Sequence, residues 1–150
     1  MQRTIRYQAA IIRDHHVLLI QHRHHASGYS YWVLPGGGLE GDEAPEACVQ
    51  REVREETYLH VEVGQHVLDD PDMPGGSYQR LHTYLCHVID GEAQPGLEPE
   101  VEAAEEYAIT AVRWLDLRQP AAWGMNLRSE PVTYPLLQRL RAALGYPEAY

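Results

Sequence analysis

Apolar residues recur along this chain in two patterns, one typical of strands and one typical of helices. Short apolar or alternating runs bounded by polar turns favour strands. The first two runs are joined by the polar turn Arg13–His16. The predicted strands are Ile5–Ile12, Val17–His22, Trp32–Val33, Leu59–Leu68, Tyr78–Ile89 and Ala108–Leu115. The predicted loops are His24–Tyr31, Asp69–Gly76, Asp90–Glu106 and Gln119–Pro131.

Two helices complete the expected set of elements. Apolar residues at helical spacing predict a terminal amphipathic helix over Val132–Leu144, ending at Gly145. An earlier helix is predicted to run to about Thr57, with Asp42 or Glu43 as its N-cap and a proline in its first turn. Strands with one early and one late helix predict an α/β fold in which a mixed sheet lies between helices. A length of 150 residues suits one domain over residues 1–150.

Three carboxylates mark the early helix as a candidate for chemistry. Glu52, Glu55 and Glu56 stand at positions i, i+3 and i+4, which share one face of a helix. Like charges at this spacing repel, so their presence together suggests a bound cation. Clustered hard oxygen ligands suit Mg²⁺ or Mn²⁺. The alternative is a solvated acidic face whose glutamates pair locally with Arg51 and Arg54.

A run of three glycines, Gly36, Gly37 and Gly38, precedes this helix. Such a run allows positive φ angles and close approach of the backbone to a ligand. A glycine-rich loop leading into an acidic helix is therefore a candidate metal–phosphate site. It is not a P-loop, because the required spacing is missing and the chain contains no lysine.

The same segment resembles the signature of the Nudix hydrolase family, G-x5-E-x7-R-E-U-x-E-E-x-G-U, where U is a bulky aliphatic residue. Eight positions fall on this pattern in register: Gly37, Glu43, Arg51, Glu52, Val53, Glu55, Glu56 and Leu59. One position departs, since Tyr58 stands where the family has a second glycine. A tyrosine in a left-handed helix cap costs about 1 kcal/mol or more. No metal ligand is lost by this change, so we expect activity to survive it.

The resemblance implies a Nudix-like α/β/α sandwich and a role for each matched residue. Glu52, Glu55 and Glu56 would bind the divalent metal, together with the carbonyl oxygen of Gly37. Arg51 and Glu43 would form an ion pair that braces the loop against the helix. Glu56 would also be a candidate for handling the attacking water. Some family members use a carboxylate outside the signature, and here Glu105 or Glu106 could serve.

The implied reaction is Mg²⁺-dependent hydrolysis of a diphosphate linkage, in a nucleoside diphosphate linked to another moiety or in a nucleoside triphosphate. A metal-activated water would attack phosphorus. The alternative is a catalytically silent Nudix-like domain that senses a nucleotide without cleaving it, and Tyr58 is the one local argument for that reading.

Candidate substrate contacts come from rings and one cationic cluster. Tyr31, Trp32 and Tyr78 could stack on a nucleobase, although such rings also pack at core edges. Arg23, within a histidine-rich segment, could offset phosphate charge, although exposed histidines and arginines are common.

Composition limits the class of partner. The formal net charge of −10, from 22 acidic and 12 basic residues, disfavours a protein that coats nucleic acid. No apolar run approaches the ~20 residues of a membrane span, and the amino terminus lacks a signal-peptide core. We therefore expect a cytoplasmic protein with a small-molecule substrate and neither a nucleic acid nor a membrane partner. Edge strands or the terminal helix could pair in a homodimer, but nothing in the sequence specifies it.

Overall fold

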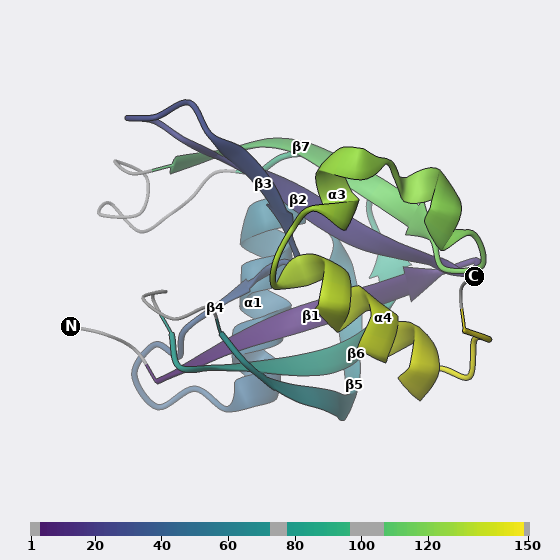
Figure 1. The fold of residues 1–150 in the computed structure, drawn as a ribbon. Helices are drawn as coiled ribbons and strands as arrows, with labels where there is room; N and C mark the ends of the chain where they lie inside the picture. The colour runs from purple at the N-terminus through teal and green to yellow at the C-terminus, as the bar shows by residue number, and fades with distance from the viewer. Residues whose placement is uncertain (1–3, 73–77, 97–106, 149–150) are drawn as a thin grey trace.

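A computed structural model describes residues 4–72, 78–96 and 107–148. Seven strands form one mixed sheet (Figure 1). The strands are β1 (Ile5–Arg13), β2 (His16–His24), β3 (Ser30–Val33), β4 (Gly36–Gly37), β5 (His60–Pro71), β6 (Arg80–Asp90) and β7 (Tyr107–Asp116). The helices are α1 (Pro45–Thr57), η1 (Pro120–Trp123), α3 (Met125–Arg128) and α4 (Thr133–Ala143).

The sheet separates along its middle, and this separation positions the glycine run. β1 pairs with β2 only near their connecting turn, at Ile12 with Val17 and at Arg13 with His16. Towards its other end, β1 pairs with β4 and runs parallel to β6, while β2 pairs with β3 and β7. The short β4 therefore brings two glycines directly against β1, at a point close to α1.

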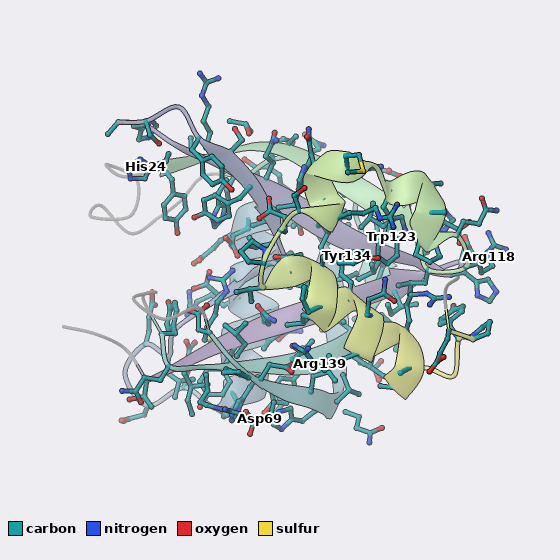
Figure 2. All side chains as sticks on the ribbon, in the orientation of Figure 1. His24, Asp69, Arg118, Trp123, Tyr134 and Arg139 are labelled. Atoms are coloured by element: carbon teal, nitrogen blue, oxygen red, sulfur yellow. The ribbon has the colours of Figure 1, made fainter. Side chains whose placement is uncertain are left out.

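Helices cover both faces of the sheet, which confirms the predicted α/β sandwich. α1 packs on one face through Cys48, Val49 and Val53. α4, α3 and η1 pack on the other, where Trp123 and the leucines of α4 are buried (Figure 1; Trp123 is labelled in Figure 2). Cys48 and Cys86 are free and buried. In the described part of the chain, no helix has the length and apolar character to span a bilayer.

The signature helix α1 ends where the sequence predicts but begins differently. Its N-cap is Ala44, without a side-chain hydrogen bond, so the prediction of Asp42 or Glu43 was wrong. Glu43 instead directs its carboxylate to Arg51. Pro45 occupies the first turn, as expected. At the other end, Tyr58 is a left-handed C-cap with φ 64° and ψ 10°, so the chain accepts the conformation that glycine favours.

Two loop predictions need correction. β5 continues to Pro71 and pairs Asp70 with Leu81, so residues 69–71 are strand although Pro71 suggested a loop. The segment Gln119–Pro131 contains two short helices, η1 and α3, and is therefore only partly irregular. The first error arises because pairing with β6 overrides the local composition around Pro71. The predicted helix Val132–Leu144 is confirmed within one residue at each end.

Candidate active site

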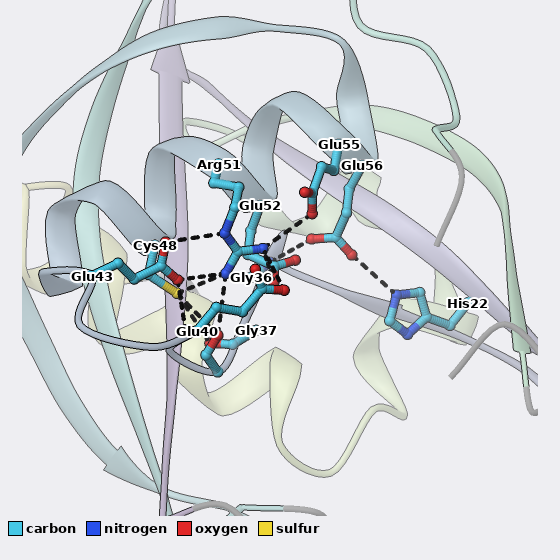
Figure 3. A network of polar contacts seen from close by, with 11 residues as sticks. His22, Gly36, Gly37, Glu40, Glu43, Cys48, Arg51, Glu52, Glu55 and Glu56 are labelled. Carbon is cyan, nitrogen blue, oxygen red and sulfur yellow. Dashed lines mark hydrogen bonds and ion pairs between the residues drawn. The ribbon is translucent and has the colours of Figure 1, made fainter. Parts of the chain in front are cut away.

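Arg51 is the centre of a network of carboxylates from α1 and the loop before it (Figure 3). Its guanidinium binds Glu43 through two hydrogen bonds, Nη2 to Oε1 at 2.6 Å and Nε to Oε2 at 3.1 Å. Its Nη1 donates to Glu52 Oε1 at 3.0 Å and to Glu55 Oε2 at 3.1 Å. The structure thus contains the ion pair of Arg51 with Glu43 that joins the loop to the helix. Hydrogen bonding to Glu43 raises the pKa of Arg51, and the same contact lowers the pKa of Glu43.

Glycine is required beside the glutamates because the backbone approaches them closely. A Cβ at Gly37 would collide with the carboxylate of Glu52, and one at Gly36 would collide with the carbonyl of Tyr7. Neither glycine has a positive φ. The positive φ angles that such a run allows are therefore not used at Gly36 and Gly37, and close contact of the backbone is the reason for these residues. Gly38 is also buried, and its carbonyl accepts a hydrogen bond from Arg51 at 3.3 Å.

Glu56 is held between the glycine run and a histidine. The amide of Gly36 donates to Glu56 Oε1 at 2.8 Å. The second oxygen, Oε2, lies 3.9 Å from Nε2 of His22 on β2, and both side chains are almost fully buried (Figure 3). The predicted site did not include His22, because only the pairing of strands brings residue 22 to the last turn of α1.

The two buried carboxylates repel each other. Burial, followed by the negative charge of Glu56, raises the pKa of Glu52 well above its ordinary value. Arg6 on β1 opposes this effect. Burial by itself would lower the pKa of Arg6, but the nearby charges, with Glu56 the largest of them, raise it instead. Arg6 also donates to the carbonyl of Leu34 at 2.9 Å. The signal that could have identified it is a charged residue within an otherwise apolar strand.

A short segment after β6 braces the end of α1. The amide of Gln94 donates to the carbonyl of Thr57 at 3.0 Å. The amide of Gly96 donates to the carbonyl of Glu56 at 2.8 Å. A Cβ at Gly96 would collide with the carbonyl of Glu55. Residues 91–96 are a loop, as predicted, and this loop contacts the turn that carries two of the three signature glutamates.

The residues present fit a divalent cation by their chemistry. Glu52 and Glu56 offer hard carboxylate oxygens in a setting where two buried negative charges need compensation. Glu55 is turned towards Arg51, and its side chain is partly exposed. Among residues 4–72, 78–96 and 107–148, no three Asp, Glu, His or Cys side chains already converge in metal-ligand geometry. The carbonyl of Gly37 faces the thiol of Cys48 at 3.7 Å.

The predicted substrate residues divide between two faces of the sheet. Tyr31 lies beside His22, and Tyr78 is near enough to Arg6 to affect its pKa. Trp32 instead packs against the core beneath α4. Arg23 is exposed, and its guanidinium lies next to the turn at Gly28. The additional carboxylate candidates, Glu105 and Glu106, lie outside the described residues.

Known proteins are similar to this chain in sequence and in fold. The family model described as the NUDIX domain matches residues 3–138. A CTP pyrophosphohydrolase of Escherichia coli is 34% identical over 141 residues, covering 93% of each chain. An ADP-ribose pyrophosphatase of Haemophilus influenzae is 32% identical over 92 residues, which are 60% of this chain and 42% of that protein. The chain spans 32% of the length of one further curated relative and 22% of another.

Solved structures agree with the sequence comparison. The crystal structure of a MutT NUDIX hydrolase from Burkholderia pseudomallei superimposes with a TM-score of 0.68 at 27% identity, covering 93% of this chain and 99% of that one. The match of the family model over most of the chain and the similarity to these relatives lead to one conclusion: the chain belongs to the Nudix family of pyrophosphohydrolases.

Proposed function

We propose that this protein is a Mg²⁺-dependent hydrolase that cleaves the diphosphate linkage of a small nucleotide. The substrate would be a nucleoside triphosphate or a nucleoside diphosphate joined to another group. One observation carries the proposal: Glu52 and Glu56, 3% and 1% exposed, lie together beside Gly36 and Gly37, where a Cβ would collide with the carbonyl of Tyr7 and with the carboxylate of Glu52. A pair of buried carboxylates is costly unless a cation is bound or a proton is taken up.

The names of the relatives support the substrate class. The E. coli relative that matches along almost its whole length is named for CTP, and the H. influenzae relative is named for ADP-ribose. Both compounds contain a nucleoside attached to a diphosphate linkage. The net charge of −10 favours a small polyanion that arrives complexed with metal over a long nucleic acid.

Each residue of the site has a definite task in this proposal. Glu52, Glu55 and Glu56 hold the cation, with Gly37 as a further oxygen donor. A bound divalent ion would neutralise phosphate charge and lower the pKa of a water molecule. Glu56 is the candidate to accept the proton of that water, since the amide of Gly36 fixes one of its oxygens. Arg51 and Glu43 hold the loop against α1.

The alternative of a silent nucleotide-sensing domain gains no support from the helix end. Tyr58 was the local argument for it, yet Tyr58 adopts the left-handed cap, and its amide donates to the carbonyl of Arg54 at 3.0 Å. The last turn of α1 is therefore intact, and the signature glutamates are retained.

The test is a panel of nucleoside triphosphates and nucleoside diphosphate sugars, incubated with and without Mg²⁺. We expect phosphate-containing products only with the metal. Glu55→Gln and Glu56→Gln should each reduce kcat by about a hundredfold or more while the circular dichroism spectrum is unchanged. Nucleotide binding without turnover would favour the sensing domain, and full activity in both variants would refute the assignment.

A further inference from the structure

A series of aromatic rings in contact with one another extends from Glu56 to the surface of the protein. His22, 3.9 Å from Glu56, stacks on Tyr107 with ring centroids 4.2 Å apart. His22 also meets the ring of Tyr31 edge-on at 5.4 Å. Tyr31 in turn stacks on Tyr29, with centroids 6.0 Å apart and planes inclined by 23°. We call Tyr107, His22, Tyr31 and Tyr29 the ring series.

The outermost ring is unusually exposed for an aromatic side chain. Tyr29 is 59% exposed, whereas His22 at the inner end is 3% exposed. Packing alone explains the inner rings, because His22 on β2 is buried and Tyr31 on β3 and Tyr107 on β7 are half-buried. It does not explain Tyr29, which leaves most of its surface in water while one face lies on Tyr31.

The backbone fixes Tyr29 in this position. Its amide donates to Ser27 Oγ at 3.1 Å, and its carbonyl accepts from the amide of His24 at 2.8 Å. These bonds close the turn between β2 and β3, which also contains Gly28 with a φ of 71°. The backbone of Tyr29 is therefore fixed before any ligand binds, which reduces the entropy cost of placing its ring for stacking.

We propose that Tyr29 and Tyr31 form the stacking surface for the nucleobase of the substrate. The inference rests on the proposed function, since the diphosphate must lie at the glutamates for the base to reach the ring series. Stacking on a tyrosine requires a planar aromatic group but does not distinguish one base from another. The ring series therefore selects nucleotides over diphosphates of sugars or alkyl groups, without strong preference among bases.

The test compares a substrate that contains a nucleobase and a substrate that lacks one. The variants are Tyr29→Ala, Tyr29→Phe and, as a matched control at the opposite end of the sheet, Tyr146→Ala, whose ring contacts His15. The substrates are CTP and 5-phosphoribosyl 1-diphosphate, which has no base. Tyr29→Ala should raise the KM for CTP by about fivefold or more with little change in kcat. The KM for the base-free substrate should be unchanged, and Tyr29→Phe should behave like the wild type.

Equilibrium binding separates a failure of this inference from a failure of the proposed function. If the wild type cleaves no nucleotide, binding of CMP and of ribose 5-phosphate is measured instead, by calorimetry. Weaker binding of CMP alone in Tyr29→Ala supports the stacking surface. Three outcomes would overturn it: an equal effect on the ligands with and without a base, no effect on either ligand, or the same effect in Tyr146→Ala.

Discussion

The backbone amide of Gly36 donates a 2.8 Å hydrogen bond to Oε1 of Glu56. This contact joins the glycine run to the last turn of α1, 20 residues later in the chain. It holds one oxygen of a carboxylate that is 1% exposed and leaves the second facing His22. The orientation of Glu56 therefore depends on the pairing of β4 with β1, and the site is preformed by backbone structure.

The pH dependence of stability should report on Glu52. Its pKa is raised in the folded protein by burial and by Glu56, above the ordinary value of 4.5. At lower pH both the folded and unfolded chains hold the proton. As pH rises from 4.5 through the folded pKa, only the folded state resists ionisation, so the metal-free protein loses stability. Because Mg²⁺ favours the ionised form, the rise in Tm on adding Mg²⁺ should grow with pH.

Differential scanning fluorimetry across this pH window, with Mg²⁺ or with EDTA, measures the effect. Glu52→Gln is the control, since its amide does not ionise. It should show a flatter Tm profile in EDTA and a much smaller Mg²⁺ effect. A metal-induced shift in the wild type that shrinks towards high pH would contradict the raised pKa of Glu52.

Removal of the Arg51 guanidinium should cost stability as well as activity. Arg51→Ala breaks the two hydrogen bonds to Glu43 and the contacts to Glu52 and Glu55. We expect a loss of about 2–3 kcal/mol in the free energy of unfolding, measured by urea denaturation. Arg54→Ala on the same helix is the matched control, because Arg54 is exposed; its effect should stay within about 0.5 kcal/mol. Equal losses in the two variants would show that the network adds little.

Gly96→Ala should displace the signature glutamates although none of them is replaced. A Cβ there collides with the carbonyl of Glu55, so either the segment or the end of α1 must move. We expect kcat to fall by about tenfold to a hundredfold. The Mg²⁺ concentration for half-maximal activity should rise as well. Gly64→Ala is the control, since its Cβ would meet only the carbonyl of Leu85 at 3.4 Å. Wild-type kinetics in Gly96→Ala would show that the segment does not position the helix end.

Tyr58→Gly should stabilise the protein. The left-handed conformation at Tyr58 is unfavourable for a residue with a Cβ, by about 1 kcal/mol, and the side chain is 53% exposed. Glycine removes this strain, so Tm should rise by about 2–4 °C in a calorimetric scan. Activity should be retained, because the backbone conformation is unchanged. A lower Tm would mean that contacts of the tyrosine outweigh the strain.

Local sequence was sufficient to predict one half of the site. The spacing of Glu52, Glu55 and Glu56, the glycine run and the pairing of Arg51 with Glu43 all lie within one continuous segment. Helix geometry and the resemblance to the family determine their relation. The helix Val132–Leu144 was predictable for the same reason, since its periodicity is local.

The other half depends on contacts between distant segments. Arg6 and His22 reach the glutamates only because β1 and β2 separate after their turn, which periodicity does not reveal. The role of Gly96 was hidden for a related reason, since its loop composition says nothing of the helix end that it contacts. Residues 69–71 extend β5 because β6 pairs with them, in spite of Pro71.

Direct binding of a paramagnetic divalent ion tests the central claim most sharply. Mn²⁺ is titrated into the wild type and into the double variant Glu52→Gln/Glu56→Gln, and the free ion is followed by electron paramagnetic resonance. We expect saturable binding in the wild type, competed by Mg²⁺, and the loss of that binding in the double variant. Equal binding by both proteins, or none by the wild type, would contradict it.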